Sequence, residues 1–330
     1  MGALRKLVVL ALLVAALAAG WIGWFATQPR PLPRQPFDFT VRTGSGLKTV
    51  SRQLAEEGLF PDPYTFWVAA RALGKSPTIQ AGTYRVERPP TAIEILDKLA
   101  RGDVLMVEIR FVEGTTLRQW LEILAKQPHV RNTLAGKPEP EVRAALGIID
   151  PSAEGWLFPD TYRFAPGVTD VEILKRAHGA MKKRLEEAWQ VRAPDLPLKS
   201  PYEALVLASI VEKETGVAAE RALIASVFVN RLRKGMRLQT DPTVIYGMGE
   251  SFDGNIRRKD LTADTPWNTY TRDGLPPTPI AMPGAGSLQA TVQPAQSEYL
   301  YFVGKGDGTH YFSTSLEEHN RAVAKYQLKR

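Results

Sequence analysis

The chain begins with a run of 20 residues that carry no charged side chain, Leu7–Ala26. In a helix, which rises about 1.5 Å per residue, this run spans about 30 Å, the hydrocarbon thickness of a bilayer. Trp21 and Trp24 lie near its end, and such aromatic residues are enriched at membrane interfaces. The run therefore predicts a transmembrane anchor over residues 7–26, preceded by a short N-terminus, residues 1–6.

Charges around the anchor predict its orientation. Arg5 and Lys6 precede it, which favours a cytoplasmic N-terminus, although Arg30 and Arg34 follow closely and weaken the asymmetry. The expected location is the cell inner membrane, crossed once, with the body of the chain in the periplasm. The alternative is a cleaved signal peptide with a processing site at residues 18–20. An uncleaved anchor is preferred, because cleavage there would leave an unusually aromatic new terminus.

Composition narrows the class of protein. The chain has 330 residues, 44% hydrophobic and 23% charged, which is typical of one or two folded domains. It contains no cysteine, which excludes disulfides and thiolate metal sites, and its four histidines lack metal-ligand spacing. We therefore expect no metal and no cofactor. The net charge is +7, but four of these charges fall in residues 1–36, so no nucleic-acid partner is predicted.

After a proline-rich spacer, residues 27–36, short strands and helices alternate and predict an α+β fold. Strand, glycine turn and amphipathic helix follow one another from Phe39 and again from Val107. The intervening pattern predicts helices near 64–73 and 92–99 and a strand over 82–86. This β-α-α-β order resembles LysM-type glycan-binding modules and predicts a LysM-like subdomain over 37–127. A generic α+β platform is the alternative.

A connector rich in proline, glycine and charge, residues 128–153, leads to a mainly helical second domain, residues 154–330. The domain opens with an aromatic block, 154–164, which suits either a buried strand or a surface that stacks on sugar rings. Long helices are expected over 170–190 and 200–215.

The helix over 200–215 has clear ends. Ser200 is expected to be its N-cap, Pro201 its first residue, and Glu203 the partner that completes a capping box. Gly216 is expected to provide the C-terminal cap.

One carboxylate on this helix stands out. Glu214 continues the apolar stripe formed by Leu207, Ile210 and Val211. Burial disfavours the charged form of a carboxyl and raises its pKa, as a general acid near neutral pH requires. The structural alternative is an ion pair between Glu214 and Arg221 or Arg231.

The segments that follow are dense in polar residues. Asp241 before Pro242 is expected to be a helix N-cap, a structural role more often than a catalytic one. The segments 267–270 and 274–284 predict proline-fixed loops of the kind that position ligands.

Five strings together resemble one family. They are Ala208–Thr215, Val227–Leu232, Met236–Gly247, Asn268–Tyr270 and Gly274–Pro277, and they are similar to those of the endolytic murein transglycosylase (YceG-like) family.

The resemblance implies a membrane-anchored protein with a LysM-like part and a lysozyme-like catalytic domain. The implied reaction cuts the β-1,4 bond between N-acetylmuramic acid and N-acetylglucosamine within nascent peptidoglycan strands and leaves 1,6-anhydro ends. The family's catalytic glutamate matches Glu214. The substrate-binding residues it implies are Gln239, Thr240, Asp241, Tyr246, Asn268 and Tyr270. Trp267 departs from the tyrosine expected at its position. The implied partners are glycan strands, the inner membrane and peptidoglycan synthases.

Two other functions stay open at this point. One is a non-catalytic, membrane-anchored scaffold that binds peptidoglycan. The other is an ordinary muramidase, which would use Asp241 as a second carboxylate and leave reducing ends.

Overall fold

The computed structural model describes residues 2–74 and 79–328. Helices predominate and the strands are short, in keeping with the predicted α+β class. The chain divides into an N-terminal unit, Met1–Val107 with Arg163–Gly167, and a C-terminal unit, Glu108–Tyr162 with Val168–Arg330.

This division differs from the expected boundaries at 127 and 153. Residues 108–127 belong to the C-terminal unit because their backbone is bonded there. For example, the Gly114 N–H donates to the Met282 carbonyl at 2.9 Å. The LysM-like, connector and catalytic assignments themselves stay predictions.

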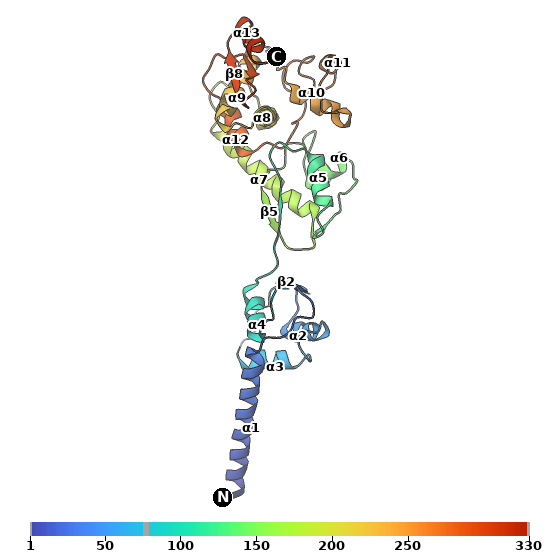
Figure 1. The fold of residues 1–330 in the computed structure, drawn as a ribbon, viewed down its shortest axis with the longest axis vertical. Coiled ribbons are helices and arrows are strands. Elements are labelled where there is room, and N and C mark those ends of the chain that lie inside the picture. Colours follow the sequence, from blue (N-terminus) through green and yellow to red (C-terminus); the bar gives the residue numbers. More distant parts are fainter. Residues whose placement is uncertain (1, 75–78, 329–330) are drawn as a thin grey trace. The chain divides into compact units, whose positions relative to one another are not determined.

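The described residues of the N-terminal unit form a strand pair and four helices. They are drawn mainly in blue and cyan in Figure 1. The elements are α1 (Gly2–Thr27), β1 (Phe37–Val41), α2 (Leu47–Glu56), α3 (Thr65–Ala72), β2 (Gly82–Val86) and α4 (Ala92–Arg101). β1 and β2 pair antiparallel with Phe39 opposite Tyr84. Because side chains alternate along a strand, Phe37, Phe39 and Val41 all point into the core. The predicted β-α-α-β order is thus present from β1 to β2.

The apolar helix α1 is long enough to cross a membrane, by length and composition, and a signal sequence would pass the same test. Its side chains are exposed along most of its length, but Phe25 and Ala26 in its last turn are buried in the N-terminal unit. There the Phe25 ring lies 5.7 Å from the Phe60 ring, and the Arg30 guanidinium lies 4.5 Å above Phe25. The end of α1 is therefore part of a folded core.

The C-terminal unit is mainly helical. Its elements, with β3 and β5 at the boundary between the units, are β3 (Val107–Arg110), α5 (Leu117–Ala125), β4 (Val130–Arg131), α6 (Glu139–Leu146), β5 (Thr161–Phe164), β6 (Val168–Thr169), α7 (Asp170–Gln190), α8 (Pro201–Glu214), η1 (Ala218–Glu220), α9 (Arg221–Arg233), α10 (Asp241–Met248), η2 (Gly249–Ser251), α11 (Arg258–Thr262), α12 (Ala285–Val292), β7 (Tyr301–Gly304), β8 (His310–Ser313) and α13 (Leu316–Tyr326). The two long helices predicted from the sequence are α7 and α8.

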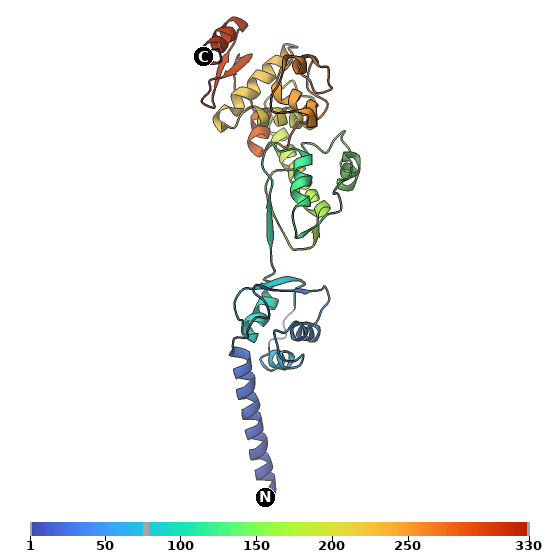
Figure 2. The ribbon, with the colours of Figure 1, turned by 45° about the vertical axis from the view of Figure 1, so that its right-hand side comes forward.

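Helix α8 lies at the centre of this unit. Residues 204–211 are all buried, and α8 contacts α7, α9, α10 and α12. β7 and β8 form an antiparallel hairpin on which α13 packs. The hairpin and α13, in red, lie at the margin of the helical group (Figure 2). The buried central helix provides a rigid support for the residue at its C-terminal end.

Candidate active site

Both ends of α8 have defined contacts. Ser200 is the N-cap, as expected, and its hydroxyl accepts from the Glu203 N–H at 3.3 Å. The predicted capping box is incomplete, since the Glu203 carboxylate accepts from the Lys199 N–H at 2.6 Å instead. The helix ends at Glu214 because Thr215 is extended, and Gly216 is not in the left-handed conformation expected for a glycine cap.

The Glu214 carboxyl lies in a desolvated setting at the end of the buried stripe. The Thr240 hydroxyl donates to its Oε1. Burial raises the pKa of Glu214 to about 7, and the negative charge of Asp241 acts in the same direction. The bond from Thr240 and the nearby His310 and Arg231 oppose this rise. A carboxyl with this pKa is populated both as acid and as carboxylate at neutral pH.

The alternative of a simple ion pair does not describe Glu214. The Arg231 guanidinium instead donates to the backbone carbonyls of Leu300 at 2.7 Å and Leu238 at 2.8 Å. Arg221 lies 3.9 Å from Glu212. Among residues 2–74 and 79–328, no cation lies within 4.0 Å of the Glu214 carboxylate.

Glu214 lines a cavity of about 430 Å³ in the C-terminal unit. The α9–α10 segment and the loop after α11 contribute four of the predicted residues: Gln239, Thr240, Asp241 and Tyr270. The hairpin and α13 contribute further polar and aromatic side chains: Tyr301, His310 and His319. The cavity therefore surrounds one titratable carboxyl with hydroxyl, amide and ring groups, which suits a polar ligand such as a sugar.

Gln239 is held in an uncommon backbone conformation. Its φ of 50° lies in the left-handed region, and its N–H donates to the Thr269 carbonyl at 3.1 Å. A residue other than glycine adopts this conformation only where its surroundings enforce it, which is common at ligand sites. The backbone of Gln239 is thus held in place, and its exposed side chain lines the cavity.

Asp241 and Tyr270 form a pair at the same cavity. The Tyr270 hydroxyl donates to Asp241 Oδ1 at 2.6 Å, and burial raises the pKa of Tyr270 above its ordinary value. The predicted capping role of Asp241 is wrong, because Thr240 is the N-cap of α10 and Asp241 is already helical. Its carboxylate faces Tyr270 instead.

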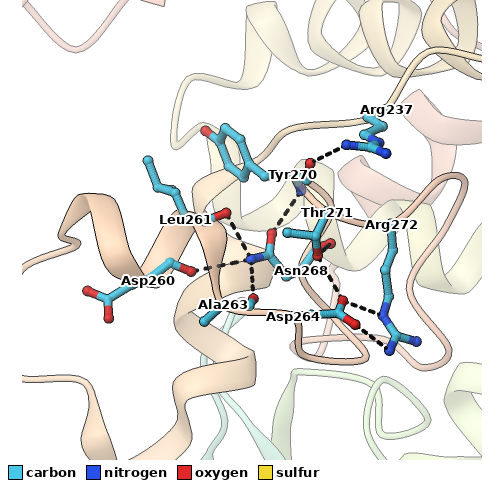
Figure 3. Close-up of polar contacts among 9 residues, drawn as sticks. All are labelled: Arg237, Asp260, Leu261, Ala263, Asp264, Asn268, Tyr270, Thr271 and Arg272. Carbon is cyan, nitrogen blue, oxygen red and sulfur yellow. Dashed lines mark hydrogen bonds and ion pairs between the residues drawn. The ribbon is translucent and has the colours of Figure 1, made fainter.

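Asn268 does not line the cavity, contrary to expectation. It is fully buried, and its amide donates to the carbonyls of Asp260, Leu261 and Ala263 at 3.3, 3.2 and 2.7 Å (Figure 3). Its Oδ1 accepts from the Tyr270 N–H at 2.8 Å. Asn268 therefore holds the loop that carries Tyr270, a structural role that its amide fills completely.

Tyr246 also lies outside the lining of the cavity. Its ring meets the Trp267 ring edge-on at 5.4 Å, and its hydroxyl donates to Glu154 Oε2 at 3.3 Å. Of the aromatic block over 154–164, Leu157, Phe158 and Tyr162 are buried, and none of its rings lines the cavity. This favours the core interpretation of the block.

Two features were missed in the sequence. One is Glu154, a buried carboxyl whose pKa burial raises to about 8. Its apolar neighbours in the sequence were a signal that could have found it. The other is the contact between His310 and Glu220 at 2.7 Å, which joins residues far apart in the chain and has no local signal. In the part of the chain that the structure describes, no group of three or more His, Asp or Glu side chains is arranged to hold a metal ion.

The comparison with known families shows which family the chain belongs to. A model of the YceG-like family matches residues 39–325. The chain belongs to this family. The match includes α8, the hairpin and every cavity residue named above, so the YceG-like assignment applies to the site described here.

Two relatives and one solved structure are similar to this YceG-like chain. The endolytic murein transglycosylase of Bacillus subtilis (strain 168) is 31% identical over 306 residues, covering 88% of this chain and 84% of the relative. That of Streptococcus pneumoniae (strain D39) is 26% identical and covers 87% of this chain, which spans only 57% of the relative's length. A crystal structure of a yceG-like protein from Listeria monocytogenes, 30% identical, matches 87% of this chain and 98% of its own with a TM-score of 0.55.

Proposed function

We propose that this protein is an endolytic lytic transglycosylase, which cuts the β-1,4 bond between N-acetylmuramic acid and N-acetylglucosamine inside peptidoglycan strands. Membership of the YceG-like family and the printed name of the relatives support this function. The observation that carries it is the position of Glu214. Its carboxyl ends a buried helix, lines an open polar cavity and has a pKa raised to about 7.

In the proposed reaction, Glu214 acts first as an acid. Its proton moves to the glycosidic oxygen as the bond from that oxygen to C1 of the muramyl sugar breaks. The C6 hydroxyl oxygen of the same sugar then bonds to C1, and its proton returns to the Glu214 carboxylate. The products are a 1,6-anhydro end and a free 4-hydroxyl on the leaving sugar, and no water is consumed.

One carboxyl is sufficient for this cycle if it is present in both protonation states near neutral pH. Burial makes Glu214 a weaker acid, and the Thr240 hydroxyl stabilises its carboxylate once the proton has left. Hydrolysis with two carboxylates needs a second group to attack or to activate water. Asp241 is the nearby candidate, but it is exposed and its Oδ1 accepts from Tyr270.

Product analysis tests the proposal. The full-length protein in detergent is incubated with uncrosslinked glycan strands, and the new ends are identified by mass spectrometry. The expected result is 1,6-anhydro-muramyl ends from the wild type and from Glu187→Gln, a surface control on α7, and none from Glu214→Gln. Reducing ends would indicate a muramidase, with loss of activity in Asp241→Asn as its signature. Strand binding without cleavage would indicate the scaffold function.

We further propose that α1 is an uncleaved anchor, with its N-terminus in the cytoplasm and the rest of the chain outside it. Arg5 and Lys6 before the apolar run support this orientation. The LysM-like assignment of β1–β2 and an association with peptidoglycan synthases are parts of the same proposal.

A further inference from the structure

A carboxylate–histidine pair lies beside the Glu214 cavity. The Glu220 carboxylate faces His310 with both oxygens: Oε2 lies 2.7 Å from the ring Nδ1, and Oε1 accepts from the His310 backbone N–H at 3.0 Å. The two side chains are only 13% and 15% exposed. Glu220 ends η1, which follows α8, and His310 begins β8. The pair therefore joins the segment after the candidate catalytic residue to the C-terminal hairpin.

This contact determines how the His310 ring can be used. A carboxylate accepts hydrogen bonds only, so Nδ1 carries the proton that is donated to Glu220. The second ring nitrogen, Nε2, has no hydrogen-bond partner among the described residues and is not one of their buried unpaired atoms. Nε2 is thus open to a ligand.

The ring is also fixed in place. The Phe302 ring meets it edge-on at 5.4 Å, and the Phe312 ring lies 6.3 Å away. His310 lines the same cavity as Glu214, and its charge acts on the pKa of Glu214. A ring that is oriented by a carboxylate on one side and has a free nitrogen on the other is a preorganised hydrogen-bonding group.

We propose that His310 binds the glycan at the catalytic cavity, through a hydrogen bond between Nε2 and a hydroxyl of the sugar beside Glu214. A hydroxyl suits this position because it can donate to a neutral Nε2 and accept from a protonated one. Glu220 is then a positioning residue, which acts by holding the ring. This inference rests on the proposed function, since the ligand is the glycan substrate.

Two amide substitutions separate this role from a structural one. In His310→Asn the amide nitrogen takes the place of Nδ1, so the bond to Glu220 is kept and the Nε2 group is lost. In His310→Gln the amide reaches the place of Nε2, so the group that meets the sugar is kept and the bond to Glu220 is lost. His129→Asn, outside the cavity, is the matched control.

We expect His310→Asn to keep the wild-type Tm within about 2 °C and to lower kcat/KM for glycan cleavage by about tenfold, the effect of one lost hydrogen bond. His310→Gln should lower Tm more than His310→Asn does and should lower kcat/KM less. Glu220→Gln should keep Tm and lower activity less than His310→Asn does, because the amide still holds the ring and a hydroxyl can accept from Nε2–H of the other tautomer. His310→Asn with full activity, or activity in all variants that simply follows Tm, would overturn the proposal.

A binding measurement separates this inference from the proposed function. Uncrosslinked glycan strands are titrated into Glu214→Gln and into the double variant Glu214→Gln, His310→Asn. We expect about tenfold weaker binding by the double variant. Equal binding overturns the role of His310 and leaves the transglycosylase proposal intact. A wild type that binds strands but never cleaves them overturns the proposed function. The difference in binding between the single and the double variant still tests the contact of His310 in that case.

Discussion

The regions around Glu214 and Glu154 each contain a carboxyl whose pKa is raised by burial to neutral pH or above, yet only one is suited to chemistry. Burial raises the pKa of Glu214 to about 7 and that of Glu154 to about 8. Glu214 lines an open cavity and accepts a single side-chain hydroxyl bond, from Thr240. Glu154 is 4% exposed and accepts from the Leu117 N–H at 3.0 Å and from Tyr246. A raised pKa therefore marks a catalytic acid only where a ligand can reach it.

The largest expected effect is that of Glu214→Gln. The amide keeps the shape of the side chain but cannot supply a proton, so we expect glycan cleavage to fall by about a thousandfold. Tm should stay close to that of the wild type, since the amide oxygen can still accept from Thr240. The rate is measured by release of new glycan ends, with Glu187→Gln as the control. Cleavage at the wild-type rate would show that the Glu214 region is not the reacting one.

Thr240→Val should have the next largest effect. It removes the hydroxyl that stabilises the Glu214 carboxylate, which costs about 1.5 kcal/mol, or about tenfold in rate. It should also raise the pKa of Glu214, because this bond lowers it. Since the acid form starts the reaction, the alkaline limb of kcat/KM should move to higher pH. A limb that stays in place would mean that another group titrates.

Asp241→Asn should move the same limb the other way. The Asp241 charge raises the pKa of Glu214, so its removal should lower that pKa and shift the alkaline limb to lower pH, by less than about one unit. The pH profile of kcat/KM is again the measurement. Complete loss of cleavage in this variant would instead indicate the two-carboxylate muramidase.

Glu154→Gln should leave cleavage nearly unchanged and alter stability with pH. The folded-state pKa of Glu154, about 8, is higher than its ordinary value of 4.5, so the proton stabilises the fold. That contribution is complete below pH 4.5 and is lost as the pH rises through 8. The amide does not ionise, so Tm of the variant should fall less than that of the wild type between pH 5 and pH 9, by about 2–4 °C for each kcal/mol. Parallel Tm curves would contradict a protonated Glu154.

The same contrast shows what the sequence could predict. The helical period places Glu214 on the stripe of Ile210 and Val211, and that local pattern is sufficient to predict α8 and the buried setting of this carboxyl. The roles of polar residues in loops are harder to predict, because the same residue types bind ligands and form the hydrogen bonds of turns. Asn268 proved to be of the second kind and Tyr270 lines the cavity.

The pairing of Glu220 with His310 could not be predicted from the sequence, for another reason. It depends on the return of the C-terminal hairpin to the helix that follows Glu214, and such a long-range contact leaves no periodic signal. The division of the chain at Val107 has the same origin, since it is set by backbone bonds of residues 108–127 to distant segments.

The most direct test of the central claim is to run the reaction in water enriched in ¹⁸O. Attack by the muramyl C6 hydroxyl, with Glu214 as the only acid and base, consumes no water, so the new ends should carry no ¹⁸O and should be lighter by one water than reducing ends. Mass spectrometry of the wild-type products measures both the ¹⁸O content and the mass of the new ends. The reaction is quenched early to limit exchange of oxygen between reducing ends and water. Reducing ends that carry one ¹⁸O would contradict the account and assign hydrolysis to this site.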